Sequence, residues 1–124
     1  MRILIVDDSP TFLRAASDII EAEGYEVETA RNGKEGVQFA KKFKPDLIIM
    51  DIEMPIMSGI KATQELRGDP EFTGVPIVAM TSNAPESLGE HIKLFEAHLT
   101  KPFGFNEIIP LVKSLLSKKG NSQQ

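Results

Sequence analysis

Short apolar stretches alternate with segments of helical spacing along this chain. Residues 3–6, 47–50 and 77–80 are apolar at every position, a pattern typical of parallel strands that are buried on both faces. A weaker strand is expected at residues 26–30 and a short fifth one near Leu99. Between these stretches, apolar residues recur at helical spacing and predict helices with one core-facing side. The expected core positions are Phe12, Ala16, Ile19 and Ile20; Val37, Ala40 and Phe43; and Ile108, Val112, Leu115 and Leu116.

Helix and turn signals fall at the borders of these stretches. Ser9-Pro10 supplies an N-cap and a proline for the first helical position, and Ser58-Gly59 opens another helix. Asn32-Gly33 marks a turn. Strand and helix thus alternate about five times. Since parallel neighbours need crossover helices, the pattern predicts an α/β fold, a doubly wound sheet with helices on both faces.

Composition and charge narrow the class of protein. With 124 residues, of which 41% are hydrophobic, the chain fits one domain with a core of ordinary size. Its formal charge of -4, without a long basic run, argues against a nucleic-acid surface. It has no cysteine, which excludes disulfides and thiolate metal sites, and no stretch long and apolar enough to cross a bilayer. We therefore expect a cytoplasmic protein.

Five chemically active side chains are predicted to meet at one edge of the sheet. Asp7 and Asp8 follow the first strand, Asp51 the third, Thr81 the fourth and Lys101 the fifth. Ligands of such sheets bind at the carboxyl ends of the strands, beside the point where strand order reverses. Each residue alone has an ordinary explanation, such as a helix cap or a solvated surface charge. Their joint placement at the strand ends is what indicates a site.

The charges at this edge indicate a metal. Two carboxylates about 5 Å apart repel by roughly 3 kcal/mol at an effective dielectric constant near 20, and a third carboxylate adds to that repulsion. A hard divalent cation relieves it, and a few carboxylates with room for waters suit Mg²⁺ better than Ca²⁺. With Mg²⁺ bound, a phosphoryl group could approach Asp51, whose carboxylate is a suitable nucleophile. Lys101 and Thr81 could then bind phosphoryl oxygens.

Four stretches of sequence resemble the receiver domain of bacterial response regulators, including the single-domain chemotaxis type. They are I-L-I-V-D-D-S-P at 3–10, P-D-L-I-I-M-D-I-E-M-P-I-M-S-G at 45–59, P-I-V-A-M-T-S-N-A at 76–84 and T-K-P-F at 100–103. The resemblance implies a flavodoxin-like three-layer sandwich with a five-stranded parallel sheet in the order 2-1-3-4-5. It also implies a receiver domain over residues 1–118, followed by a polar tail, 119–124, that we expect to be disordered.

The resemblance assigns roles to the acidic residues. Asp51 would be the phosphoacceptor and, together with Asp8, a direct ligand of Mg²⁺. Asp7 would assist through a water molecule, and the backbone carbonyl of Glu53 would be a further ligand. These roles come from the family and not from the spacing of the residues.

The resemblance also describes how a signal would enter and leave. A histidine kinase or phosphotransfer protein would phosphorylate Asp51, Thr81 would move toward the phosphoryl group, and Lys101 would contact it. The Lys101-Pro102 peptide bond would be cis. The face made by the fourth helix, fifth strand and fifth helix would then change its affinity for a protein partner not identified by the sequence. The implied protein is a signalling domain and not an enzyme. Since no DNA-binding segment follows residue 118, we expect output by protein contact, unless the chain is a fragment of a longer protein.

Two features depart from the usual pattern of that family. The chain between Thr81 and Lys101 is short, and the segment 94–99 lacks the customary glycine-and-acid turn, so the fourth helix or its exit loop must be trimmed. His98 stands where receivers commonly place a tyrosine or phenylalanine that changes rotamer with the threonine. An imidazole there could titrate near neutral pH, although a partly exposed histidine without a role is the simpler interpretation.

Three other functions are compatible with parts of the sequence. An aspartate-nucleophile phosphohydrolase would share the D-x-E of Asp51 and Glu53, but by family comparison such enzymes carry their acid pair after the first strand and use additional cap segments, neither of which this short chain offers. A flavin-binding module would share the architecture, but Asp7-Asp8 would repel the flavin phosphate. A phosphorylation-independent interaction module on a receiver scaffold is harder to exclude, because intact site residues do not prove that a kinase exists.

Overall fold

The computed structural model describes residues 1–54 and 56–121, and within 118–121 only the backbone. Its strands are β1 (Arg2–Val6), β2 (Glu26–Ala30), β3 (Leu47–Asp51), β4 (Ile77–Thr81) and β5 (Ala97–Thr100). The α-helices are α1 (Pro10–Ala22), α2 (Gly33–Phe43), α3 (Gly59–Arg67) and α4 (Phe105–Asn121). Two 3-10 segments, η1 (Pro70–Phe72) and η2 (Pro85–Leu94), flank β4.

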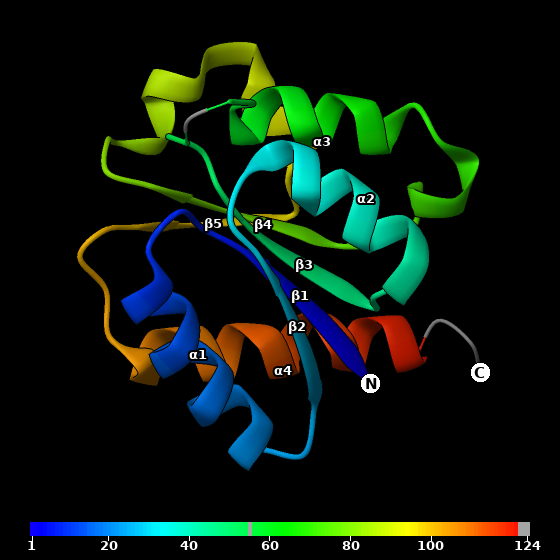
Figure 1. The fold of residues 1–124 in the computed structure, drawn as a ribbon, viewed down its shortest axis with the longest axis vertical. Helices are drawn as coiled ribbons and strands as arrows, with labels where there is room; N and C mark the ends of the chain where they lie inside the picture. The colour runs from blue at the N-terminus through cyan, green and yellow to red at the C-terminus, as the bar shows by residue number, and fades with distance from the viewer. Residues whose placement is uncertain (55, 122–124) are drawn as a thin grey trace.

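The strands form one parallel sheet in the order β2-β1-β3-β4-β5, with helices on both of its faces (Figure 1). This is the predicted doubly wound α/β fold with its predicted strand order. The order reverses between β1 and β3, which pair in register from Ile3↔Leu47 to Val6↔Met50. The carboxyl ends of β1 and β3 therefore lie side by side, at the place where such sheets bind their ligands.

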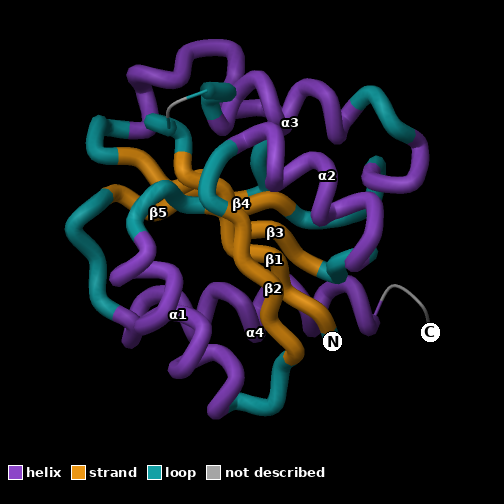
Figure 2. The backbone as a smooth tube through the Cα atoms, in the orientation of Figure 1, coloured by secondary structure: helices purple, strands orange, loops and turns teal. Residues whose placement is uncertain are grey.

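Alternate side chains of the same strands face two separate cores. In Figure 2, α1 and α4 lie on one side of the sheet, and α2, α3 and η2 lie on the other. Ile3 and Ile5 of β1 point toward α1 and α4, whereas Leu4 and Val6 point toward α2 and α3. Burial on both faces explains why these strands are apolar without alternation.

Most of the predicted core positions are buried. Ala16, Ile20, Val37, Ala40, Ile108, Val112 and Leu116 are buried, and Phe12, Ile19, Phe43 and Leu115 are half-buried. Leu13, which the predicted stripe omitted, is also in the core. Helix α1 thus turns a slightly different face to the sheet than the pattern indicated, with Leu13, Ala16 and Ile20 at its centre.

Arg67, at the end of α3, connects several segments at the edge of the sheet opposite to the carboxyl ends. Its guanidinium donates hydrogen bonds to the carbonyl oxygens of Phe72, Val75 and Leu94 at 2.9, 2.9 and 3.1 Å. It also pairs with the Glu96 carboxylate at 2.6 Å. The side chain is only 17% exposed, so these bonds replace water at loop carbonyls that would otherwise lack partners.

The connection from β4 to β5 is where the expected trimming occurs. In place of the α-helix expected between β4 and β5, the chain forms η2. This segment consists of two 3-10 turns separated by Gly89, which has φ 57° and ψ -131°. That backbone conformation is accessible to glycine and strained for other residues. Leu88 and Phe95 still reach the core, so the segment covers its side of the sheet with fewer residues than a helix would need.

Two sequence-based expectations concern the limits of the domain and its environment. Helix α4 continues to Asn121, and the last part of the proposed tail, 122–124, lies outside the described residues, so the domain limits stay a prediction. Within the described ranges, none of the helices has the length and apolar character needed to span a membrane.

Candidate functional site

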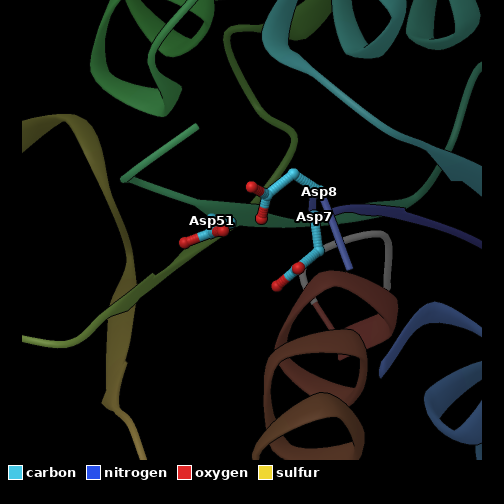
Figure 3. Close-up of side chains that lie close together, drawn as sticks. All are labelled: Asp7, Asp8 and Asp51. Carbon is cyan, nitrogen blue, oxygen red and sulfur yellow. The ribbon is translucent and has the colours of Figure 1, made fainter. Parts of the chain in front are cut away.

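Three carboxylates gather at the carboxyl ends of β1 and β3 (Figure 3). Asp7 and Asp8 follow β1 directly, and Asp51 is the last residue of β3. One oxygen from each residue can be chosen so that all three oxygens lie within 4.8 Å of one another. The predicted acidic cluster therefore exists, built from segments more than forty residues apart in the sequence.

The loop between β1 and α1 holds Asp7 in one orientation. The Asp7 N–H donates to the Ala30 carbonyl at 3.0 Å, and Asp7 Oδ1 accepts a 2.9 Å hydrogen bond from the Ser9 N–H. Ser9 in turn caps α1, because its hydroxyl oxygen accepts from the Phe12 N–H. Asp7 is thereby 1% exposed with both its backbone and side chain engaged, whereas Asp8 is exposed.

Asp51 is almost completely buried at the end of β3. The residue is 2% exposed, and a Cβ on Gly59 at the start of α3 would come within 2.0 Å of its carbonyl oxygen. Only glycine permits α3 to begin so close to the end of β3. Its Oδ1 atom is buried and receives no hydrogen bond of ordinary length from any described residue.

Lys101 brings a positive charge to the carboxylates. Its Nζ lies 3.1 Å from Asp7 Oδ2 and 3.4 Å from Asp51 Oδ1. The ammonium also lies 5.8 Å from the centroid of the Phe12 ring, within range of a cation-π interaction. Burial by itself would lower the pKa of Lys101, but Asp51 and Asp7 outweigh it, and the pKa is raised. Lys101 therefore stays charged and bridges the two buried acids.

A single ammonium does not neutralise this cluster. The pKa of Asp51 is raised from 3.8 to about 6, first because the carboxyl is buried and second because the Asp7 charge repels its ionised form. Lys101 counteracts both effects, and the Glu53 charge adds a smaller repulsion. The site thus lacks positive charge, which is the condition under which a divalent cation binds well.

Thr81 ends β4 next to Asp51, and its hydroxyl has a partner that the sequence did not indicate. The hydroxyl donates to Glu53 Oε2 at 3.2 Å and accepts from the Asn83 N–H at 3.1 Å. Glu53 Oε1 also accepts a 2.9 Å hydrogen bond from the Ser82 N–H. The sequence had assigned only the backbone carbonyl of Glu53 to the site, and that role stays a prediction.

A hollow of about 540 Å³ opens beside these groups. Polar and apolar side chains share its lining, which consists of Asp7, Ser9, Phe12, Ser82, Lys101, Pro102 and Phe103. The Phe12 and Phe103 rings meet edge to face at a centroid distance of 6.0 Å and form its apolar wall. A group that approached the carboxylates from this side would pass along the aromatic wall and meet the ammonium of Lys101.

The structure brings together all five residues that the sequence placed at the strand ends. Asp7, Asp8, Asp51 and Lys101 form one cluster, and Thr81 borders it through the pairing of β3 with β4. The Lys101-Pro102 peptide bond is cis, as the resemblance implied. His98 is exposed on the edge strand β5, and its role is untested.

The sequence matches the response regulator receiver domain over residues 3–113, and the chain belongs to this family. Receiver domains are signalling domains of two-component systems. Among curated proteins, the chain is 37% identical over 116 residues to the polar-differentiation response regulator DivK of Brucella anthropi, covering 92% of this chain and 94% of that protein.

Solved structures show the same likeness. The chemotaxis response regulator CheY4 of Vibrio cholerae superposes with a TM-score of 0.86 at 29% identity, covering 92% of this chain and 97% of that one. The response regulator TrrA of Thermotoga maritima, solved in complex with Mg²⁺ and beryllofluoride, gives a TM-score of 0.83 at 32% identity over 92% and 97% of the two chains. The fold is therefore the flavodoxin-like fold that the sequence predicted.

Proposed function

We propose that this domain accepts a phosphoryl group on Asp51 in a reaction that requires Mg²⁺. The observation that carries the proposal is the cluster of three carboxylates, in which one oxygen of each lies within 4.8 Å of the others. Asp51 Oδ1 in this cluster is buried without a hydrogen-bond partner among the described residues and faces the ammonium of Lys101. Receiver domains bind Mg²⁺ at such an acidic site. In the related TrrA, that metal was observed together with beryllofluoride.

The donor atoms fit Mg²⁺ in number and kind. Two oxygens bound to one Mg²⁺ at about 2.1 Å can be at most about 4.2 Å apart, so a spread of up to 4.8 Å leaves space for a water between the metal and one carboxylate. Asp7 is the residue for that indirect role, because both of its oxygens already accept hydrogen bonds. Asp8 and Asp51 would be the direct ligands, with the carbonyl of Glu53 as a further one.

In the proposed step, an oxygen of Asp51 forms a bond to phosphorus while the bond between phosphorus and the leaving group breaks. The leaving group keeps the electron pair, as acetate from acetyl phosphate or as the imidazole of a phosphohistidine, which then takes up a proton. Mg²⁺ would offset the negative charge at the reacting oxygens. Lys101 would bind one phosphoryl oxygen, and Thr81 would move inward to donate a hydrogen bond to another.

The donor would be a histidine kinase or a histidine phosphotransfer protein in the cytoplasm. The hollow lined by Phe12, Lys101 and Phe103 would offer its histidine an approach to Asp51, which lies 3.4 Å from the Lys101 ammonium. Phosphorylation would then alter the surface formed by η2, β5 and α4, where a protein partner would bind. The residues of this surface, including His98, would determine which partner is recognised.

Incubation with acetyl phosphate and Mg²⁺, followed by intact mass measurement, tests the proposal. We expect one phosphoryl group per chain, lost in Asp51→Asn and when the metal is chelated. Asp18→Asn, a matched change on the exposed side of α1, should leave labelling unchanged. Labelling that survives Asp51→Asn would refute the role of Asp51.

The same experiment separates the competing functions. Continuous release of many phosphate molecules per chain would favour a phosphohydrolase. Absence of labelling together with unchanged binding of a partner would favour an interaction module that does not depend on phosphorylation.

A further inference from the structure

We propose that the carboxylate of Glu53 acts as an internal substitute for the phosphoryl group and must be displaced before Thr81 and Ser82 can bind phosphoryl oxygens. The inference rests on the proposed phosphorylation of Asp51 and adds a positioning residue to it. It assigns a role to the Glu53 side chain, separate from the metal-binding role expected of its backbone carbonyl.

The evidence is the pair of hydrogen bonds made by one carboxylate. Glu53 Oε2 accepts from the Thr81 hydroxyl at 3.2 Å, and Glu53 Oε1 accepts from the Ser82 N–H at 2.9 Å. These two donors are consecutive along the chain at the carboxyl end of β4, beside Asp51. A carboxylate and a phosphoryl group both present two or more anionic oxygens, so the same donors suit either group.

Both donors are already occupied in the unphosphorylated chain. The Thr81 hydroxyl has one proton, and Glu53 accepts it, so this hydroxyl cannot donate to a phosphoryl oxygen at the same time. The negative charge of Glu53 also repels an incoming anion at short range. An arriving phosphoryl group therefore competes with Glu53 for the donors and for space near them.

The Glu53 side chain is able to leave. The residue is exposed, and its described hydrogen bonds are those with Thr81 and Ser82, so the carboxylate can turn into water without opening the core. Thr81, which is 1% exposed, cannot find water in the same way. The Glu53 carboxylate therefore accepts the hydrogen bond of the buried Thr81 hydroxyl until a better acceptor is present. It also holds the Thr81 side chain toward Glu53.

Beryllofluoride, a non-covalent mimic of the phosphoryl group, measures this competition. We expect Glu53→Ala to bind beryllofluoride about tenfold more tightly than the wild type at saturating Mg²⁺, equivalent to about 1.4 kcal/mol. Glu53→Gln, which retains length but not charge, should fall between them. Glu65→Gln removes the same charge from an exposed position on α3 and should match the wild type.

Two further measurements distinguish competition from a general structural effect. The Ser82 amide should exchange with deuterium faster in Glu53→Ala, because it loses its acceptor. In phosphorylation by acetyl phosphate at saturating Mg²⁺, the change should appear in the half-saturating donor concentration and not in the maximal rate. Urea unfolding should show that the Glu53 variants are folded.

The outcomes separate the inference from the function on which it rests. Equal beryllofluoride affinity in wild type, Glu53→Ala and Glu53→Gln would overturn the inference alone, as would weaker binding by Glu53→Ala. A wild-type protein that binds no beryllofluoride with Mg²⁺ and takes no phosphoryl group would overturn the proposed function and the inference with it. Tighter binding in both Glu53 variants, with Glu65→Gln unchanged, supports both.

Discussion

Replacing Asp51 by asparagine should stabilise the metal-free domain. Asp51 is 2% exposed and lies next to Asp7, and Lys101 compensates only part of the unfavourable energy of its negative charge. Asparagine has nearly the same shape as the protonated acid and has no charge at any pH. The substitution therefore removes the cost of a buried carboxylate while preserving its volume.

The magnitude follows from the pKa. In the folded protein, the pKa of Asp51 is raised from 3.8 to about 6, so folding is favoured by its neutral form. The stability that protonated Asp51 contributes to the protein is fully present below the unfolded-state pKa of 3.8, and it is lost as the pH rises through the folded-state pKa of about 6. A tenfold change in proton affinity corresponds to about 1.36 kcal/mol, so the ionised carboxylate costs the fold about 3 kcal/mol at pH 8. At pH 5, about half of this cost remains.

Urea unfolding followed by far-UV circular dichroism suits a chain without tryptophan. With EDTA present, Asp51→Asn should exceed the wild type in free energy of unfolding by about 3 kcal/mol at pH 8 and by about half as much at pH 5. Adding Mg²⁺ should reduce the difference, because the metal stabilises the wild type. An Asp51→Asn variant no more stable than the wild type at pH 8, or a difference independent of pH, would refute this account of the site.

Three other changes test separate parts of the structure. Asp8→Asn should weaken Mg²⁺ binding at least tenfold in a calorimetric titration, and an unchanged affinity would remove Asp8 from the ligand set. Gly59→Ala should destabilise the fold by more than about 2 kcal/mol, because its Cβ would meet the Asp51 carbonyl at 2.0 Å, whereas Gly74→Ala, with no atom within 4 Å, should change it little. Arg67→Lys retains the charge but not the fork of donors, and it should cost about 2 kcal/mol in urea unfolding; a loss below about 0.5 kcal/mol would show that the loop carbonyls find other partners.

The sequence predicted the sheet and the acidic cluster because strong local signals determine both. Strands buried on two faces are apolar throughout, and parallel topology directs their carboxyl ends to one edge, so Asp7 and Asp51 had to be neighbours. The hydrogen bonds of the Glu53 carboxylate with Thr81 and Ser82 could not be predicted in this way. A long, exposed side chain selects among several acceptable partners only once Thr81 and Ser82 are fixed in space.

The segment between β4 and β5 was predicted only in part. Its short length indicated that a helix would be trimmed, but not that two 3-10 turns would replace it. Such turns form where the packing of Leu88 and Phe95 in the core outweighs the local preference for an α-helix. The pattern of apolar residues along the sequence does not show how strong that packing is. The register of α1 was missed for a similar reason, because Leu13 and Phe12 are equally apolar in the sequence.

The two turns of η2 also determine how far a displacement at the end of β4 can travel. A continuous α-helix transmits a push along its axis as a rod, since each turn is hydrogen-bonded to the next. Here the backbone pivots at Gly89, where no Cβ restricts rotation. The second turn is anchored on the core by Ile92 and Leu94. A shift that began at Thr81 would therefore be reduced at this pivot, and a partner on the η2 side would sense it more strongly on the first turn, close to Pro85, than at the far end of the segment.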